Sequence, residues 1–404
     1  MIVSVVRRSL SYVRRSALAG LVFAAACVAV PGRPSGPAVT PVKLAFVVDT
    51  LRSTQVAPGV TYDYVWSPVG PWAIHVLRVN RDDCWRIEAV KGGNAGIGRE
   101  PTWTLLRGLA DHEHVAAGVN ADFFIFAPPG VPRSAHVQEG RVITGPGERP
   151  VIAADSSGAL FIGRLGVSGR LIVHDDTIPL AAWNRDDARG LAYVDRAWGA
   201  VSDTGSGRVE VVVAGSPLRV VTIDTLPPGV PIPVDGAVLI AGREMDPASR
   251  RTLLALRPGD TVDVRRAISR PHLRTVVGGW PVIVRDSAVT QAADSAGASF
   301  APVRHPRTAV ALANGGRELM LVVVDGRQKP YSDGMTLREL AELLRALGAS
   351  QALNLDGGGS STFVLADSTA PNGLRIMNRP SDKVERAVGN ALAVVRGCPG
   401  GPHD

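Results

Sequence analysis

Short apolar runs separated by glycine, proline and polar residues dominate this chain, a pattern that predicts strands in preference to helices. Residues 318–324 form a continuous apolar run typical of a strand buried on both faces, and residues 352–355 form a second run that leads into Asp356. Between them, Thr336 and Glu339 have the spacing of a helix capping box, and leucines recur at helical spacing until Gly348. The pattern therefore predicts strand, helix, strand.

This order predicts a βαβ unit, with parallel strands and a right-handed crossover. Asp325 and Asp356 would then follow the carboxyl ends of two strands in one sheet, where open α/β sheets bind ligands. Asp356 precedes Gly357, Gly358, Gly359 and Ser360, and consecutive glycines allow N–H groups to converge on an anion. We expect the two carboxylates and the glycine loop to share one site.

The whole pattern predicts an α+β or mixed α/β fold with a β-rich core sheet, this βαβ unit near the C-terminus and an inserted β-rich region. Residues 44–159 and 276–397 are expected to form the two halves of the core, with a short helix near residues 103–111. Residues 160–275 contain short strands and proline–glycine turns, with helical spacing at residues 248–254, and are interpreted as the insertion. Residues 398–404 are expected to form a tail.

The N-terminus has the pattern of an export signal. Four arginines at positions 7, 8, 14 and 15 precede an apolar stretch, residues 17–30, that ends in small residues and is shorter than a bilayer-spanning helix. We expect residues 1–29 to be a signal peptide cleaved near Ala26 or Ala29, and residues 30–43 to be a linker. A periplasmic or extracellular location follows, with lipid anchoring through Cys27 as an alternative.

Cleavage of that signal would leave two cysteines. Cys84 and Cys398 each follow a strand-like run, and exported proteins commonly pair an even number of cysteines. A disulfide is the favoured reading, and two buried free thiols are the alternative. The chain has no Cys-x-x-Cys or His-x-x-x-His spacing, which disfavours a structural zinc site.

Composition excludes several classes of function. The 404 residues are 45% hydrophobic and 20% charged, as in globular proteins with a large core, and the net charge is +7. The positive charge is almost all arginine, because lysine occurs only four times, and no dense basic run alternates with aromatics, so nucleic-acid binding is not expected. The chain has no Gly-x-Ser-x-Gly elbow, Walker loop or dinucleotide fingerprint.

Several segments, in order and at matching distances, resemble the phosphodiester glycosidase family. The resemblance spans roughly residues 75–396 and is strongest over residues 304–362. The segments that carry it are Gly118-Val-Asn120-Ala-Asp122-Phe-Phe124, Gly278-Gly-Trp-Pro281, His305-Pro-Arg307-Thr308, Val324-Asp325-Gly-Arg327, Gly334-Met-Thr-Leu337, Asn354-Leu-Asp356-Gly-Gly-Gly-Ser-Ser361 and Glu385-Arg-Ala-Val-Gly-Asn390.

The resemblance implies hydrolysis of a sugar-1-phosphodiester at the anomeric carbon. The expected substrate is an α-N-acetylglucosamine-1-phosphodiester or a similar compound. The products would be a free sugar and a phosphomonoester. A phosphate leaving group has a second pKa near 6, so it needs less protonation than a sugar hydroxyl. One carboxylate then suffices as a base for water or as a nucleophile.

Three aspartates are candidates for the catalytic carboxylate. Asp356 is the first choice because of its place before the glycine loop. Asp122 is the second, because burial beside Phe123 and Phe124 would raise its pKa toward that of a general acid. Asp325 is the third. The structural alternatives are a turn cap for Asp356, an Asx-turn for Asp122 and a loop cap for Asp325.

Substrate-binding candidates surround these aspartates. The guanidinium of Arg307 is suited to phosphate oxygens, with a surface salt bridge as the alternative. Further candidates are the hydroxyls of Thr308 and Ser360 for phosphate, the amides of Asn120 and Asn354 for sugar groups, and the backbone of Gly357, Gly358 and Gly359.

Two other functions remain open at this point. A metal-dependent phosphodiesterase would use Asp122, Asp325 and Asp356 to bind a divalent cation and would cleave P–O instead of C–O. A non-catalytic envelope protein would only bind a phosphorylated glycan. The glycosidase needs no cofactor, and its partner is a phosphorylated glycan or sugar-1-phosphodiester.

Overall fold

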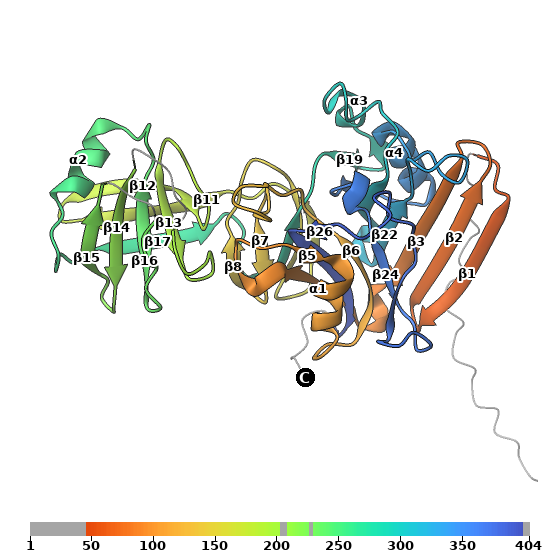
Figure 1. Cartoon of the computed structure of the whole chain (residues 1–404), viewed down its shortest axis with the longest axis horizontal. Coiled ribbons are helices and arrows are strands. Elements are labelled where there is room, and N and C mark those ends of the chain that lie inside the picture. Colours follow the sequence, from red (N-terminus) through yellow and green to blue (C-terminus); the bar gives the residue numbers. More distant parts are fainter. Residues whose placement is uncertain (1–45, 203–207, 226–228, 399–404) are drawn as a thin grey trace, which may run out of the picture. The chain divides into compact units, whose positions relative to one another are not determined.

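The computed structural model describes residues 46–202, 208–225 and 229–398 (Figure 1). The expected signal peptide, linker and the tail beyond Cys398 lie outside the described residues. None of the helices in the described ranges is long and apolar enough to cross a membrane.

Two sheets form the core. The order of strands in the eight-stranded sheet is β1 (Thr50–Ala57), β2 (Val60–Ser67), β3 (Trp72–Asn80), β22 (Glu318–Val324), β21 (Arg307–Ala313), β23 (Gln351–Asn354), β19 (Val282–Arg285) and β20 (Ala288–Val289). The order in the five-stranded core sheet is β25 (Leu374–Ile376), β24 (Phe363–Ala366), β6 (Val115–Asn120), β27 (Asn390–Arg396) and β4 (Trp85–Lys91).

Smaller elements complete this region. A second five-stranded sheet has the order β10 (Leu160–Gly163), β9 (Val151–Asp155), β18 (Leu273–Gly278), β7 (His136–Gln138) and β8 (Arg141–Thr144), and β26 (Ala387–Val388) pairs with β5 (Glu100–Pro101). The helices are α1 (Thr102–Leu109), α2 (Pro247–Ala255), α3 (Ala292–Ser295) and α4 (Leu337–Ala346). Short 3₁₀ turns occur at η1 (Arg81–Asp83), η2 (Gly92–Asn94), η3 (Asn314–Gly316) and η4 (Gly358–Ser360).

Alternating side chains explain why the central strands are apolar throughout. In β22, Leu321 and Val323 lie in the cluster shared with the five-stranded core sheet, whereas Met320 and Val322 lie in the cluster shared with α4. The other face of the five-stranded core sheet packs against the leucines of α1. Both faces of β22 are therefore buried, as the continuous apolar run predicts, and the core consists of packed layers of helix, sheet, sheet and helix.

The expected helix between the two apolar strands is confirmed. Thr336 is the N-cap of α4 and forms the complete capping box with Glu339, and Gly348 follows the helix with a φ of +97°. The two strands that flank α4 lie in one sheet but are not neighbours. β22 and β23 run in the same direction, but β21 lies between them and is antiparallel to both. Among the described strand pairs, only β12 and β13 are parallel.

Residues 167–268 contribute a sheet of their own. Its order is β15 (Arg219–Asp224), β14 (Val209–Ala214), β16 (Gly236–Ala241), β13 (Leu191–Asp195), β12 (Asp176–Trp183), β11 (Val167–Val173) and β17 (Asp263–Ile268). These strands and α2 share a separate apolar cluster. β10 and β18 instead pair with β9. The insertion limits at 160 and 275 stay a prediction.

A disulfide joins Cys84 to Cys398, 314 positions apart, in agreement with the favoured reading of the two cysteines. It closes the end of the β4–β27 ladder, where Trp85 pairs with Arg396 and the N–H of Gly397 donates to the carbonyl of Cys84 at 2.9 Å. The bond therefore fixes the last described strand to the first half of the core.

We expect the Cys84→Ser/Cys398→Ser double variant to fold but to lose about 2–4 kcal/mol of unfolding free energy, because its unfolded chain regains the freedom that the cross-link removes. Urea unfolding under non-reducing conditions measures the difference, and wild-type protein with a reductant should approach the variant. Equal unfolding free energies of variant and oxidised wild type would contradict this role.

Candidate active site

Asp122 and Asp356 follow strands that belong to different sheets. Asp122 lies two residues beyond β6 of the five-stranded core sheet, and Asp356 lies two residues beyond β23 of the eight-stranded sheet. The backbone N–H of Asp356 donates to the carbonyl of Ala121 at 2.8 Å. This bond makes Asp122 and Asp356 neighbours at the junction of the two core sheets.

Asn120 and Thr308 hold that junction together. The Asn120 amide Nδ2 donates to the carbonyl of Asp356 at 2.7 Å, and its Oδ1 accepts from the hydroxyl of Thr308 at 2.9 Å. The same Oδ1 accepts from the N–H of Thr362 at 3.1 Å. Both side chains are fully buried. Both predicted substrate-binding side chains therefore form hydrogen bonds with other groups of the protein, and these bonds position Asp356.

Asp122 is almost completely buried, with 1% of its surface exposed. Its Oδ2 accepts from the N–H of Ser134 at 2.6 Å, and its Oδ1 has no hydrogen-bond partner within the described residues. Gly278 allows this approach, because a Cβ there would overlap Ser134 and the Asp122 carboxylate. Burial raises the pKa of Asp122 to about 7, against the opposing effects of the Ser134 N–H, Arg149 and Arg185, and the charge of Asp356 adds to the increase.

Asp356 is partly exposed, and its Oδ1 accepts from the N–H of Gly357 at 3.0 Å. The surrounding protein raises its pKa to about 6 by desolvation, while Ser360, the Gly357 N–H, Arg386 and Arg149 favour the charged form. At neutral pH Asp356 is therefore mostly ionised, whereas Asp122 retains a large protonated fraction. Such a difference within one carboxylate pair suits a base beside an acid.

Arg149 supplies positive charge next to both carboxylates. Its guanidinium lies over the rings of Phe123 and Trp280, 5.0 and 5.4 Å from their centroids. Its Nη1 is buried and has no hydrogen-bond partner in the described part of the chain. Sequence reasoning did not select Arg149, although it stands before Pro150 and an apolar strand, much as Arg307 follows Pro306.

Partly exposed aromatic rings surround this arginine. Trp280 stacks on Phe300 at 5.5 Å between centroids, and Phe123 meets Phe300 edge-on at 5.9 Å. Asn354 fixes the Trp280 segment, since its Nδ2 donates to the Trp280 carbonyl at 2.7 Å and its own carbonyl accepts from the Trp280 N–H at 2.7 Å. Asn354 thus contacts the protein backbone and positions this aromatic group.

The glycine loop turns most of its donors inward. The N–H of Gly358 donates to the carbonyl of Pro306 at 2.9 Å, and the N–H groups of Ser360 and Ser361 donate to carbonyls within the loop. Gly358 has a φ of +62°, and a Cβ at Gly359 would overlap the guanidinium of Arg386. The loop therefore shapes the surface around Asp356 and brings Arg386 close, and its N–H groups do not form the expected anion nest.

Arg307 lies in the protein interior with 1% of its surface exposed. Its guanidinium donates to the carbonyls of Met335, Phe300 and Val303 at 2.7–2.8 Å. Burial lowers its pKa to about 10. These contacts show Arg307 holding the segment that carries Phe300, a different arrangement from the free phosphate fork expected from the sequence.

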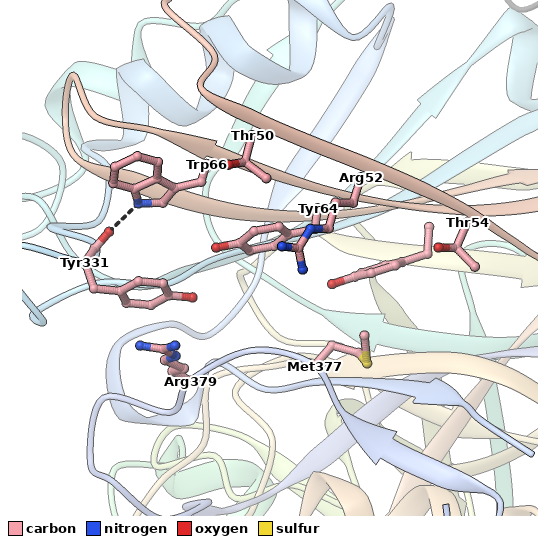
Figure 2. Close-up of a pocket in the computed structure, with 9 residues that line it drawn as sticks. Thr50, Arg52, Thr54, Tyr64, Trp66, Tyr331, Met377 and Arg379 are labelled. Carbon is pink, nitrogen blue, oxygen red and sulfur yellow. Dashed lines mark hydrogen bonds between the residues drawn. The ribbon is translucent and has the colours of Figure 1, made fainter. Parts of the chain in front are cut away.

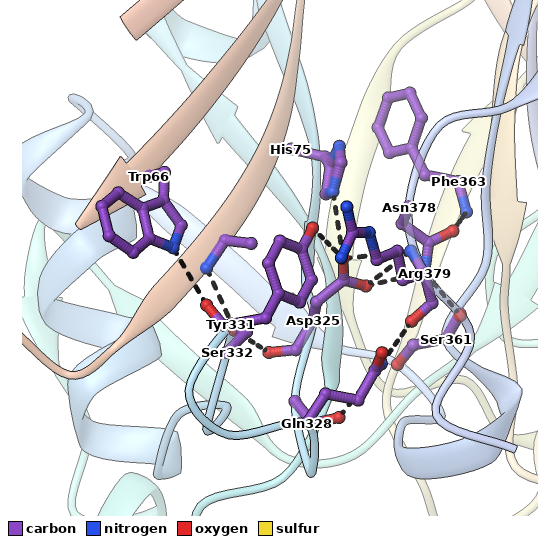
Figure 3. Close-up of polar contacts among 12 residues, drawn as sticks. Trp66, His75, Asp325, Gln328, Tyr331, Ser332, Ser361, Phe363, Asn378 and Arg379 are labelled. Carbon is purple, nitrogen blue, oxygen red and sulfur yellow. Dashed lines mark hydrogen bonds and ion pairs between the residues drawn. The ribbon is translucent and has the colours of Figure 1, made fainter. Parts of the chain in front are cut away.

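Asp325 belongs to another network (Figure 3). Its carboxylate accepts from the hydroxyl of Tyr331 at 2.9 Å, from the amide of Asn378 at 3.0 Å and from the N–H of Arg379 at 3.0 Å. The His75 Nε2 lies 3.4 Å away. Asp325 follows β22 as expected, but these contacts occupy its carboxylate, and it does not join the Asp122–Asp356 pair.

The three aspartates do not assemble a metal site. Across residues 46–202, 208–225 and 229–398, no group of three or more His, Cys, Asp or Glu side chains is arranged to hold a metal ion. The ligand set that the metal-dependent alternative requires is thus not brought together.

The model of the phosphodiester glycosidase family matches residues 207–395. This part of the chain is therefore similar to the phosphodiester glycosidase family. This segment includes Arg307, Asp325 and Asp356, in agreement with the resemblance of the motifs, whereas Asp122 and Arg149 precede it.

Known proteins similar to this chain match it over different extents. The SPbeta prophage-derived protein YomE of Bacillus subtilis is 38% identical over 92 residues, which are 23% of this chain and 13% of YomE. A crystal structure of a protein from Synechocystis has a TM-score of 0.71 at 24% identity and covers 86% of this chain and 64% of its own. This chain therefore spans less than two thirds of either protein.

A third similar protein, from Burkholderia pseudomallei, is described as exported. Its crystal structure has a TM-score of 0.63 at 26% identity and covers 80% of this chain and 74% of its own. Both crystal structures are similar in fold to this chain.

The raised pKa of Asp122 generates a stability prediction. Because the folded protein keeps this group protonated to higher pH than the unfolded chain, its contribution to stability is complete below pH about 4 and is lost as pH rises through about 7. Asp122→Asn, which retains an oxygen for the Ser134 N–H, should remove that loss. We expect the variant to gain stability relative to wild type between pH 5 and 8, by up to a few kcal/mol.

Urea unfolding of both proteins at pH 5 and pH 8 measures this effect. Asp111→Asn, at an exposed position, is the matched control and should follow wild type at both values. The same pH dependence in wild type and Asp122→Asn would show that Asp122 does not titrate in this range.

Proposed function

We propose that this protein hydrolyses a sugar-1-phosphodiester at the anomeric carbon, with an α-N-acetylglucosamine-1-phosphodiester or a similar compound as substrate. The family match over residues 207–395 supports the class of reaction. The observation that carries the proposal is the pair of adjacent carboxylates, Asp122 and Asp356. Burial raises their pKa values to about 7 and about 6, close to the pH at which an acid and a base must work together.

Asp356 acts as the base in this mechanism. Its ionised carboxylate takes a proton from water as the water oxygen bonds to the anomeric carbon, and the bond from that carbon to the phosphate oxygen breaks with its electrons passing to the phosphate. Asp122 in its protonated form donates a hydrogen bond or a proton to the departing oxygen. The phosphate needs little protonation, so departure of the leaving group requires only weak acid catalysis by Asp122.

Arg149 receives the phosphate in this proposal. Its buried Nη1 has no partner in the described residues, it lies beside both carboxylates, and a guanidinium pairs well with phosphate oxygens. The partly exposed rings of Phe123, Trp280 and Phe300 offer faces for the sugar ring. Asn120, Thr308 and Asn354 take part by positioning Asp356 and Trp280.

Export is part of the proposal. The N-terminal pattern, the Cys84–Cys398 disulfide and the likeness to a Burkholderia protein described as exported all support a periplasmic or extracellular location. Binding of a phosphorylated glycan without turnover is the remaining alternative, and product analysis separates it from hydrolysis.

We expect Asp356→Asn to lower kcat by about a hundredfold or more while the melting temperature stays close to wild type, because asparagine is nearly isosteric but cannot accept the proton from water. Asp122→Asn should also lower kcat. Release of free sugar from an α-N-acetylglucosamine-1-phosphodiester measures the rate. Normal turnover with a lowered melting temperature in Asp356→Asn would reduce this residue to a turn cap.

Hydrolysis in ¹⁸O-labelled water tests which bond breaks. A phosphomonoester without label establishes C–O cleavage, whereas label in a phosphate product would establish P–O cleavage and refute the proposal. Bound substrate with no product from wild type would support the binding protein instead.

Two arginine variants should separate phosphate contact from scaffolding. We expect Arg149→Gln to lower kcat/KM for the phosphodiester by about a hundredfold with little change in melting temperature. Arg307→Gln should instead lower the melting temperature, because three carbonyls lose a charged donor. Steady-state kinetics and thermal unfolding of both variants provide the measurement. A large loss of kcat/KM in Arg307→Gln, with only a lowered melting temperature in Arg149→Gln, would assign phosphate binding to Arg307.

A further inference from the structure

A cavity of about 640 Å³ lies away from the carboxylate pair (Figure 2). The first two strands supply one side of it, including Arg52 from β1 and Tyr62 and Tyr64 from β2. Tyr331, from the loop after β22, and Arg379, which follows β25, supply the other side. A space of this volume is large enough for a saccharide.

The cavity is positively charged. Of the nine described residues that line it, Arg52 and Arg379 are basic and none is acidic. The Arg379 guanidinium lies 4.1 Å from the centroid of the Tyr331 ring, and neither arginine forms an ion pair with another described residue. Figure 2 shows the Arg52 guanidinium extending from its strand into the space that Tyr331 and Arg379 border. Two unpaired cations facing one space favour an anionic ligand.

Buried groups behind the cavity hold its tyrosines in place. The Tyr62 hydroxyl bonds to His75 Nδ1 at 2.7 Å, and the Tyr331 hydroxyl donates to Asp325 Oδ2 at 2.9 Å. His75 and Asp325 each have 1% of their surface exposed and contact each other at 3.4 Å. The indole N–H of Trp66 donates to the Tyr331 carbonyl at 2.9 Å. The wall is therefore preorganised, which reduces the entropy lost when a ligand binds.

We propose that this cavity binds an anionic saccharide, a sugar that carries a phosphoryl or carboxyl group. The guanidinium groups of Arg52 and Arg379 pair with the anion, since charge-assisted bonds to oxyanions are the stronger class of hydrogen bond. Tyr64 and Trp66 present flat amphipathic rings to the sugar. This site also gives Asp325 and His75, which the catalytic proposal does not use, a role in positioning the tyrosines.

This inference does not depend on the proposed hydrolysis. The residues that line the cavity include none of the groups placed around Asp122 and Asp356. A protein that lacked hydrolytic activity could therefore bind the ligand here, and a protein with an empty cavity could still hydrolyse a small phosphodiester.

Isothermal titration of the oxidised wild-type protein with glucose 6-phosphate, glucuronic acid, glucose and inorganic phosphate tests the proposal. We expect saturable binding of at least one of the two anionic sugars, about tenfold or more tighter than glucose or inorganic phosphate. Tighter binding of glucose 6-phosphate assigns a phosphoryl group to the ligand, and tighter binding of glucuronic acid assigns a carboxyl group. Binding of neither anionic sugar in the millimolar range, or equal binding of glucose, overturns the proposal.

Variants locate the binding. Arg52→Gln and Arg379→Gln should each weaken it about tenfold without lowering the melting temperature, because both side chains are exposed. Arg265→Gln, at an exposed arginine on β17, is the matched control and should bind as wild type does. Wild-type affinity in both cavity variants would place the ligand elsewhere and refute the proposal.

Discussion

The hydrogen bond from the Asp356 N–H to the Ala121 carbonyl is the contact on which the candidate active site depends. It joins the ends of β6 and β23, which come from two different sheets. Asn120 strengthens the same junction from within the protein, since it binds both the Asp356 carbonyl and the Thr308 hydroxyl. Two carboxylates distant in the sequence thereby become one electrostatic unit.

Burial then decides what that unit can do. Removal of water raises the pKa of both carboxyl groups, but Asp122 is deeper and also senses the charge of Asp356. The positive charge of Arg149 limits the rise in the pKa of both carboxyl groups. Its buried Nη1 has no hydrogen-bond partner among the described residues. In the proposed mechanism, the site thus combines an acid, a base and a cation within one region, which would stabilise an anionic group as it departs.

Arginine and aspartate side chains whose hydrogen-bond partners are all within the protein stabilise the fold instead. Arg307 carries a guanidinium as Arg149 does, yet its carbonyl partners hold a loop and leave no fork directed at a ligand. Asp325 carries a carboxylate as Asp356 does, yet His75, Tyr331, Asn378 and the Arg379 backbone surround it. Satisfied hydrogen-bonding capacity therefore separates positioning residues from candidate reactive ones in this fold.

The sequence by itself determined the local features: the capping box and end of α4, the doubly buried run of β22, the short helices α1 and α2, and the family resemblance of the glycine-loop segment. The spacing of neighbouring residues controls these features, so a linear pattern reveals them. The cysteine count also indicated the disulfide, because only one pair remains once Cys27 is set aside.

Only the tertiary structure decided which polar groups meet. It placed β21 between β22 and β23, joined Asp122 to Asp356, separated Asp325 from them and brought Arg149 to the site from a segment without a motif. It also turned Arg307, Asn120 and Asn354 toward backbone partners. These outcomes depend on burial and on contacts between residues far apart in the chain. Neither can be inferred from residue types and their spacing in the sequence.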